Sequence, residues 1–166
     1  MARLRWKWWN KVAEARQWLC LGMEHAEVPF DDYVAALKDL ERQFAREART
    51  SAERLHLKRL TALNAVQAAF DQERPWKDFG SWLRRIKRLG FPSLWSRHHV
   101  ACLYAQSLPH FPEQARDAFA MLADTERRVL RRPKDRHSRQ QMLARIAHAR
   151  REAAAYGIQP DLIHSG

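Results

Sequence analysis

Apolar residues recur along most of the chain at alternating steps of three and four, a spacing that places them on one face of an α-helix. The first segment with this pattern covers about residues 4–25. Trp18 and Leu21 are expected to widen its apolar stripe. The central positions of that stripe are Trp8, Val12, Ala15 and Leu19. We expect this face to be buried.

Prolines, glycines and capping residues divide the pattern into seven helical segments. No stretch alternates apolar and polar positions with β-branched residues, so no strand is expected. The segments cover about residues 4–25, 31–49, 51–70, 76–89, 93–108, 111–132 and 136–156. The sequence therefore predicts an all-α fold, a compact bundle of six to seven helices joined by short turns marked by proline and glycine.

Local signals mark several helix ends. Asp31 or Asp32 is placed to accept the free amide hydrogens at the start of the second helix. Thr50 and Glu53 have the spacing of a capping box, in which each side chain bonds the backbone of the other residue. Gly90 follows the fourth segment as a helix stop.

The last segment carries an unbroken apolar seam with steps of four and three. Its alanines predict the close approach of another helix, and Gly157 is expected to end the segment. The seam consists of Met142, Ile146, Ala149, Ala153 and Tyr156.

The 166 residues, 46% of them hydrophobic and 30% charged, suit one globular domain, and we expect a single domain over residues 1–166. The net charge of +11 is uneven. Residues 1–74 hold 13 Lys and Arg against 11 Asp and Glu, a net of +2, whereas residues 75–166 hold 17 against 8, a net of +9. A near-neutral N-terminal half and a strongly basic C-terminal half suggest a polyanionic partner.

Other features bear on location and cofactors. No apolar run approaches the roughly 20 residues needed to cross a bilayer, and no signal peptide pattern follows the basic N-terminus, so we expect a cytoplasmic protein without a membrane span. Cys20 and Cys102 lie in apolar helical patterns and are expected to be reduced core thiols. Residues with metal-ligand spacing are absent from the sequence, and no cofactor is expected.

Two basic clusters form the candidate nucleic-acid interface. Arginine forks match phosphate oxygens, and like charges four residues apart on a helix repel one another unless an anion lies between them. If the helices that carry the clusters are neighbours, one basic groove could follow a backbone without reading its bases. A solvated charged surface is the alternative. The candidate residues are Arg84, Arg85, Lys87, Arg88 and Arg97 in the first cluster, and Arg127, Arg128, Arg131, Arg132, Lys134, Arg136 and Arg139 in the second.

Three of the seven tryptophans lie among basic residues at the N-terminus. Trp6 falls off the apolar stripe, and with Trp9 it is a candidate for stacking unpaired bases or for contacting a partner. Core packing of these rings and a membrane-surface anchor are the alternatives.

These features predict a non-enzymatic helical protein that binds a nucleic-acid backbone without sequence specificity and has protein partners in a complex. In size, class and charge the chain is compatible with a small subunit of a larger nucleoprotein complex, such as those that line the nucleic acid in CRISPR effectors. That comparison rests on gross properties, since no motif identifies a family. The alternative is a protein-interaction adaptor without nucleic-acid contact, which docks through the final seam and the N-terminal tryptophans.

A third hypothesis is a helix-turn-helix DNA-binding regulator. Its turn would be residues 89–93, and its second helix would present to a groove the side chains of Leu94, Trp95, Ser96, Arg97 and His98. Catalysis has the least support, because His98 and His99 point about 100 degrees apart on a helix and no third ligand is spaced to join them.

Overall fold

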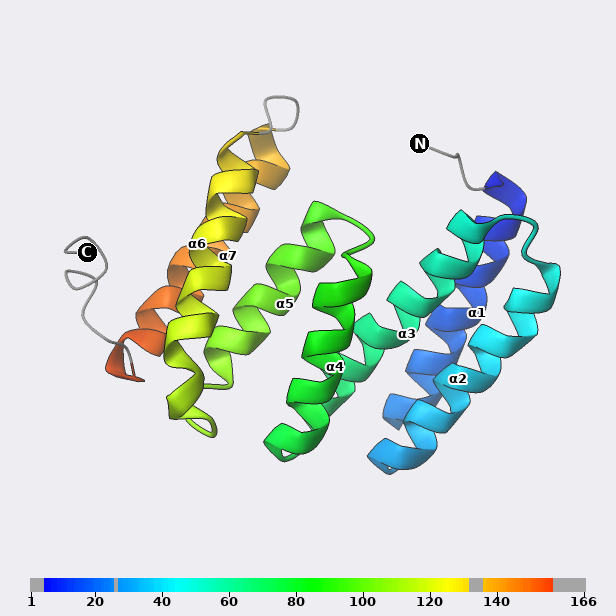
Figure 1. Ribbon diagram of the computed structural model, residues 1–166, viewed down its shortest axis with the longest axis horizontal. Coiled ribbons are helices and arrows are strands. Elements are labelled where there is room, and N and C mark those ends of the chain that lie inside the picture. Colours follow the sequence, from blue (N-terminus) through cyan, green and yellow to red (C-terminus); the bar gives the residue numbers. More distant parts are fainter. Residues whose placement is uncertain (1–4, 26, 132–135, 157–166) are drawn as a thin grey trace. The chain divides into compact units, whose positions relative to one another are not determined.

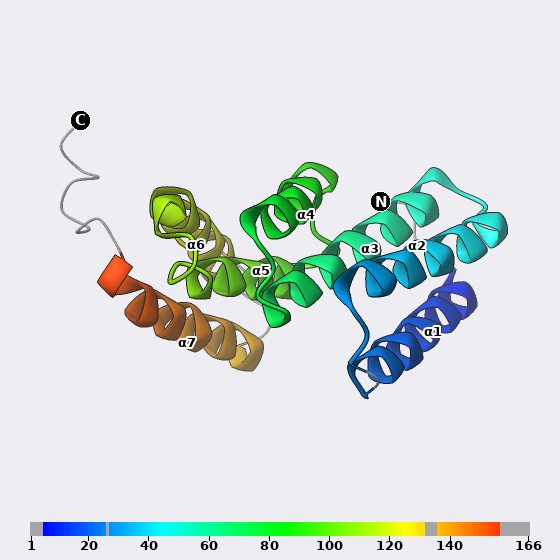
Figure 2. The same cartoon turned by 90° about the horizontal axis from the view of Figure 1, so that it is seen from below.

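The computed structural model describes residues 5–25, 27–131 and 136–156, and the chain divides into two compact units, residues 1–92 and 93–166 (Figures 1 and 2). The described residues form seven α-helices and two short 3-10 helices, with no strand. The all-α fold predicted from the sequence is therefore confirmed. The single domain over residues 1–166 stays a prediction.

The first unit contains α1 (Trp6–His25), α2 (Phe30–Glu47), α3 (Ser51–Asp71) and α4 (Trp76–Leu89). Each helix packs against the next one along the chain. Trp8 and Val12 of the predicted stripe are buried, and they join Phe44, Ala48 and Leu57 in one apolar cluster. The cluster links α1 to the corner between α2 and α3.

The predicted width of the α1 stripe is wrong. Trp18 is 69% exposed and Leu21 is exposed as well, while Ala15 and Leu19 are half-buried. The physical reason is the position of α1 at the edge of the unit, where α2 covers only a narrow stripe of it (Figure 2).

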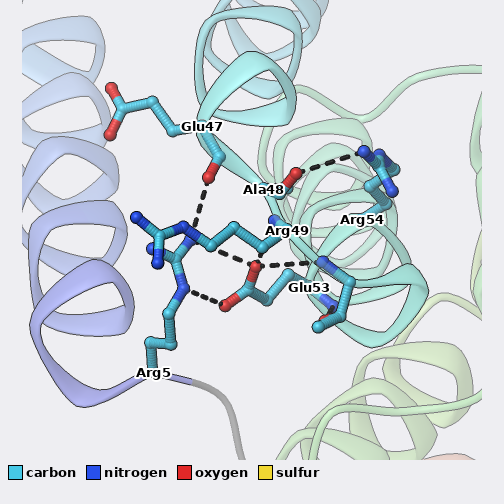
Figure 3. A network of polar contacts seen from close by, with 7 residues as sticks. Arg5, Glu47, Ala48, Arg49, Glu53 and Arg54 are labelled. Carbon is cyan, nitrogen blue, oxygen red and sulfur yellow. Dashed lines mark hydrogen bonds and ion pairs between the residues drawn. The ribbon is translucent and has the colours of Figure 1, made fainter.

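The corner between α2 and α3 contains the predicted capping box. Thr50 Oγ1 accepts a hydrogen bond from the Glu53 amide at 3.1 Å, and Glu53 Oε2 accepts one from the Thr50 amide at 3.3 Å. The same oxygen accepts the Arg49 amide at 2.6 Å, and the Arg5 guanidinium reaches the carboxylate from the start of α1 (Figure 3). Glu53 is 1% exposed. A local capping motif thus becomes a buried tertiary contact.

The start of α2 differs from the prediction. The helix begins at Phe30, with Pro29 in the capping position, and no side chain makes a capping hydrogen bond there. Asp31 and Asp32 lie inside the first turn, where their charge complements the helix dipole without bonding the free amides.

At the other end of the unit, Gly90 ends α4 as predicted, with a φ of 83° that favours glycine.

The second unit contains α5 (Leu94–Gln106), η1 (Pro112–Gln114), α6 (Ala115–Leu130), α7 (Arg136–Ala153) and η2 (Ala154–Tyr156). Helix α5 packs against both α6 and α7. Val100 and Ala101 are completely buried, and the buried Tyr104 hydroxyl donates to Asp117 Oδ2 at 3.0 Å. The centre of this unit is therefore α5.

The seam of α7 is confirmed at four of its five positions, since Met142, Ile146, Ala149 and Ala153 are buried. Tyr156 is exposed, because the helix tightens into η2 after Ala153 and its period changes. The predicted cap at Gly157 lies outside the described residues.

Candidate nucleic-acid interface

Helix α4 is sharply divided between an apolar and a basic side. Phe79, Leu83 and Ile86 are buried against the rest of the unit. A stripe with steps of four, three and four runs along the exposed side. It consists of Lys77, Ser81, Arg84 and Arg88, all of them exposed. Because the apolar side of α4 is buried, the opposite side and its three cations, Lys77, Arg84 and Arg88, face solvent.

Arg84, Arg85 and Arg88 of α4 lie in a stretch of the sequence without acidic residues. No Asp or Glu occurs in the sequence between Asp78 and Glu113. Asp78 itself lies 2.8 Å from Arg74. Among the described residues, no ion pair joins Arg84, Arg85 or Arg88 to a carboxylate. This surface therefore carries positive charge that the protein does not neutralise locally.

Two further cations approach α4 from neighbouring helices. The Arg85 guanidinium lies 5.3 Å from the centre of the Trp82 ring, and the Lys38 amine lies 5.8 Å from it, so cations from α4 and α2 share one aromatic side chain. Arg59 of α3 donates from Nε to the Leu89 carbonyl at 2.8 Å. That bond satisfies a free carbonyl at the C-terminal end of α4.

The second cluster is arranged differently, because two of its arginines, Arg127 and Arg128, meet Arg97 of the first cluster at Asp124. Arg97 Nη2 lies 2.5 Å and Arg128 Nε 2.8 Å from Asp124 Oδ2, and Arg127 Nη2 lies 3.6 Å from Oδ1. Burial opposes ionisation of this carboxyl, but hydrogen bonds and charge from Arg128 and Arg97 outweigh it and lower its pKa. A carboxylate of the protein thus occupies the centre of this cluster.

The remaining candidates of the second cluster lie around the end of α6 and the start of α7. Arg131 is exposed and Arg139 is half-buried. Arg132 and Lys134 lie outside the described residues, as does the side chain of Arg136. Because α4 and α6 belong to separate units, the groove that would join the two clusters stays a prediction.

The unit boundary changes the distribution of charge that the sequence indicated. Residues 1–92 hold 18 Lys and Arg against 12 Asp and Glu, a net of +6. Residues 93–166 hold 12 against 7, a net of +5. The surplus assigned to the C-terminal half is therefore shared, because the basic helix α4 belongs to the first unit.

Of the residues that the helix-turn-helix hypothesis presents to a groove, α5 exposes Trp95 but buries two others. Ser96 and His98 are buried, and Arg97 is bound to Asp124. His98 Nδ1 donates to the Trp95 carbonyl at 2.7 Å, and burial lowers the pKa of this imidazole. His98 is thus a core histidine, which contradicts its assignment to an accessible surface.

The two N-terminal tryptophans singled out by the sequence lie outside the core. Trp6 is 72% exposed, whereas Trp8 between them is 5% exposed. The Trp6 and Trp9 rings stack with centres 6.0 Å apart and 12° between their planes. The core-packing alternative therefore fails for Trp6.

Sequence reasoning missed three residues of these surfaces. Lys77 lies seven residues before Arg84 on the same stripe of α4, and that spacing was a signal for it. Asp124 and Arg59 carry no such signal, because each acts on a residue that is distant along the chain.

Within residues 5–25, 27–131 and 136–156, no group of three or more His, Cys, Asp or Glu side chains is placed to hold a metal ion. A pocket of about 440 Å³ opens between α1, α2 and α3, and Glu24, Glu27 and Asp71 are among its lining residues, so it is acidic.

Cys102 is buried, which raises its pKa to about 11, and Cys20 is half-buried, with Sγ 3.2 Å from the Tyr33 hydroxyl.

No protein-family model matches the chain, and neither a curated protein nor a solved structure is found to be similar to it. None of the helices in the described part of the chain has the length and hydrophobicity to span a membrane.

Proposed function

We propose that this protein binds the phosphate backbone of nucleic acids without sequence specificity, and that α4 of the first unit is the principal contact. The observation that carries the proposal is the exposed pair Arg84 and Arg88, which lie in a stretch without Asp or Glu between Asp78 and Glu113, with Lys77 on the same stripe of the helix. Arginine and lysine gain most from phosphate contact where no carboxylate competes for them.

The Asp124 cluster is a secondary contact in this proposal. Arg127 and Arg128 remain largely exposed although they contact Asp124, with side-chain exposures of 68% and 55%. Three arginines around one carboxylate leave two positive charges uncompensated, so the cluster still attracts polyanions. We assign the larger share of binding to α4 because no carboxylate of the described residues pairs with Arg84 or Arg88.

The test is fluorescence anisotropy of the full chain with labelled single-stranded and duplex DNA and RNA of unrelated sequences, across a salt series. For the variant Arg84→Glu/Arg88→Glu we expect at least about a tenfold loss of affinity near 0.15 M salt and a salt dependence smaller by about two phosphates. Phosphates carry no base identity, so sequence changes should matter little.

Helix α2 offers a matched control, Arg42→Glu/Arg46→Glu. These residues are exposed and stand at the same distances from the end of their helix as Arg84 and Arg88 do from the end of α4. The control makes the same change in net charge. Equal losses for both double variants would reduce the effect to net charge, and unchanged binding of the α4 variant would overturn the assignment.

A protein-interaction adaptor is the second candidate, and one observation favours it. Trp18 and Leu21 lie one turn apart on α1 and are both exposed. The α7 seam, which this alternative also used, is buried inside its own unit. Size-exclusion chromatography with light scattering tests it: a stable oligomer that Trp18→Ala disrupts, together with no nucleic-acid binding, would favour the adaptor.

A further inference from the structure

The start of α1 carries a short ladder of aromatic rings. Trp6 stacks on Trp9, whose ring centre lies 6.3 Å from the imidazole of His56 on α3. Burial lowers the pKa of His56, and the charges of Arg59 and Arg16 lower it further, so the ring is neutral near pH 7. The ladder therefore begins in solvent at Trp6 and ends on α3 with an uncharged ring.

The ladder is connected to the basic helix. His56 and Arg59 lie one turn apart on α3, and Arg59 binds the Leu89 carbonyl at the end of α4. The N-terminal ends of α1 and α3 and the C-terminal end of α4 lie at the same end of the first unit (Figure 1). A continuous series of contacts thus leads from the exposed ring of Trp6 to the turn that carries Arg88.

This combination favours unpaired bases over the other ligands of exposed tryptophans. Single-stranded nucleic acid is bound where cations follow the backbone and aromatic side chains stack bases, each stacked base contributing roughly 1–3 kcal/mol. A duplex hides its base faces, so it can use only the cations. Trp6 offers an exposed flat ring in a stack, and the same unit carries Arg84 and Arg88 exposed on α4.

We propose that the first unit binds single-stranded nucleic acid, with a base stacked on Trp6 and the adjoining phosphates on the α4 cations. This inference rests on the proposed function and adds to it a preference for single strands. A protein contact at Trp6 is the competing outcome of the test.

The experiment compares Trp6→Ala with Trp18→Ala in the full chain. Both tryptophans lie on α1 with similar exposure, 72% and 69%, so the second variant controls for the loss of an exposed indole. The probes are a labelled oligothymidylate of about 12 nucleotides, an abasic phosphodiester of the same length, and a duplex. Thermal melting verifies that each variant is folded.

We expect Trp6→Ala to weaken oligothymidylate binding by roughly 5- to 150-fold, the stacking contribution of one base, and to leave the abasic and duplex probes unchanged. Trp18→Ala should leave all three unchanged. Wild-type affinity of Trp6→Ala for oligothymidylate, or equal losses for the abasic probe, would overturn the inference. So would a change of oligomeric state with no change in binding.

The two proposals fail separately. If Arg84→Glu/Arg88→Glu abolishes binding while Trp6→Ala has no effect, the backbone contact stands and the stacked base does not. If neither variant changes binding, the proposed function is refuted, and the inference that rests on it is refuted as well.

Discussion

The guanidinium Nε of Arg5 lies 2.7 Å from Oε1 of Glu53, and its Nη2 also donates to the Glu47 carbonyl at 2.8 Å (Figure 3). One arginine therefore joins the start of α1 to the end of α2 and to the first turn of α3. The side chain of Glu53 is almost fully enclosed, so its charge depends on this partner and on the two amides of the corner.

Replacing Glu53 by Gln should destabilise the first unit. The amide keeps one acceptor but loses the ion pair and leaves buried donors poorly matched, and we expect a loss of about 2 kcal/mol in the free energy of unfolding. Chemical denaturation measures it. Thr50→Ala, which removes only the other half of the capping box, should cost about 1 kcal/mol. If Glu53→Gln leaves the free energy of unfolding unchanged, the Arg5–Glu53 ion pair does not contribute to stability.

The same pair predicts the dependence of stability on pH. The hydrogen bond from Arg5 lowers the pKa of Glu53 from 4.5 to about 2; burial opposes the shift, and the Arg49 and Thr50 amides add to it. A depressed folded pKa stabilises the protein above pH 4.5, and this contribution is lost as the pH falls from 4.5 toward 2. The stability gap between wild type and Glu53→Gln should therefore be constant near neutrality and close below pH 4.5. A gap that is the same at pH 6 and pH 3 would contradict this.

Replacing either of two helical glycines by alanine should change the stability of the protein, in opposite directions for the two positions. At Gly80 a Cβ atom would lie 2.6 to 2.9 Å from the indole of Trp76, so Gly80→Ala should destabilise the protein by roughly 1–2 kcal/mol despite its better helix propensity. At Gly22 no atom lies within 4 Å of a Cβ, so Gly22→Ala should stabilise it by about 0.5–1 kcal/mol. Thermal melting of both variants tests the pair, and equal signs would refute the packing argument.

Asp124→Asn should strengthen the binding of polyanions while lowering stability. The substitution removes the carboxylate that Arg97, Arg127 and Arg128 share, so these arginines become available to phosphates and the salt dependence should steepen by about one phosphate. Asp39→Asn is the control, because it makes the same charge change at a carboxylate that pairs with Arg42 within α2. An affinity that rises equally in both variants reflects net charge alone. Unchanged or weaker binding would remove the Asp124 cluster from the interface.

Much of the fold could be predicted because its signals are local. The bounds of α4 and the capping box at Thr50 and Glu53 depend on residues within one or two helical turns of each other. The errors arose where packing decides exposure. Trp18 has the right spacing for a buried stripe, but α1 has too few neighbours to cover it.

The candidate site shows the same division. The clusters of arginines were visible along the chain, and Trp6 was recognised because it leaves the apolar stripe. Their partners could not be predicted, because these partners are distant in the sequence. Asp124 lies 27 residues after Arg97, and His56 lies on α3 whereas Trp9 lies on α1. Whether a cation is neutralised depends on such contacts, and spacing in one helix carries no information about them.

For this protein, composition and periodicity were sufficient to establish the helices, several of their ends and an excess of positive charge, because each follows from the chemistry of neighbouring residues. Only tertiary structure decided which cations stay without a carboxylate and which tryptophan rings stay in solvent. Burial and ion pairing depend on the side chains that distant segments bring together.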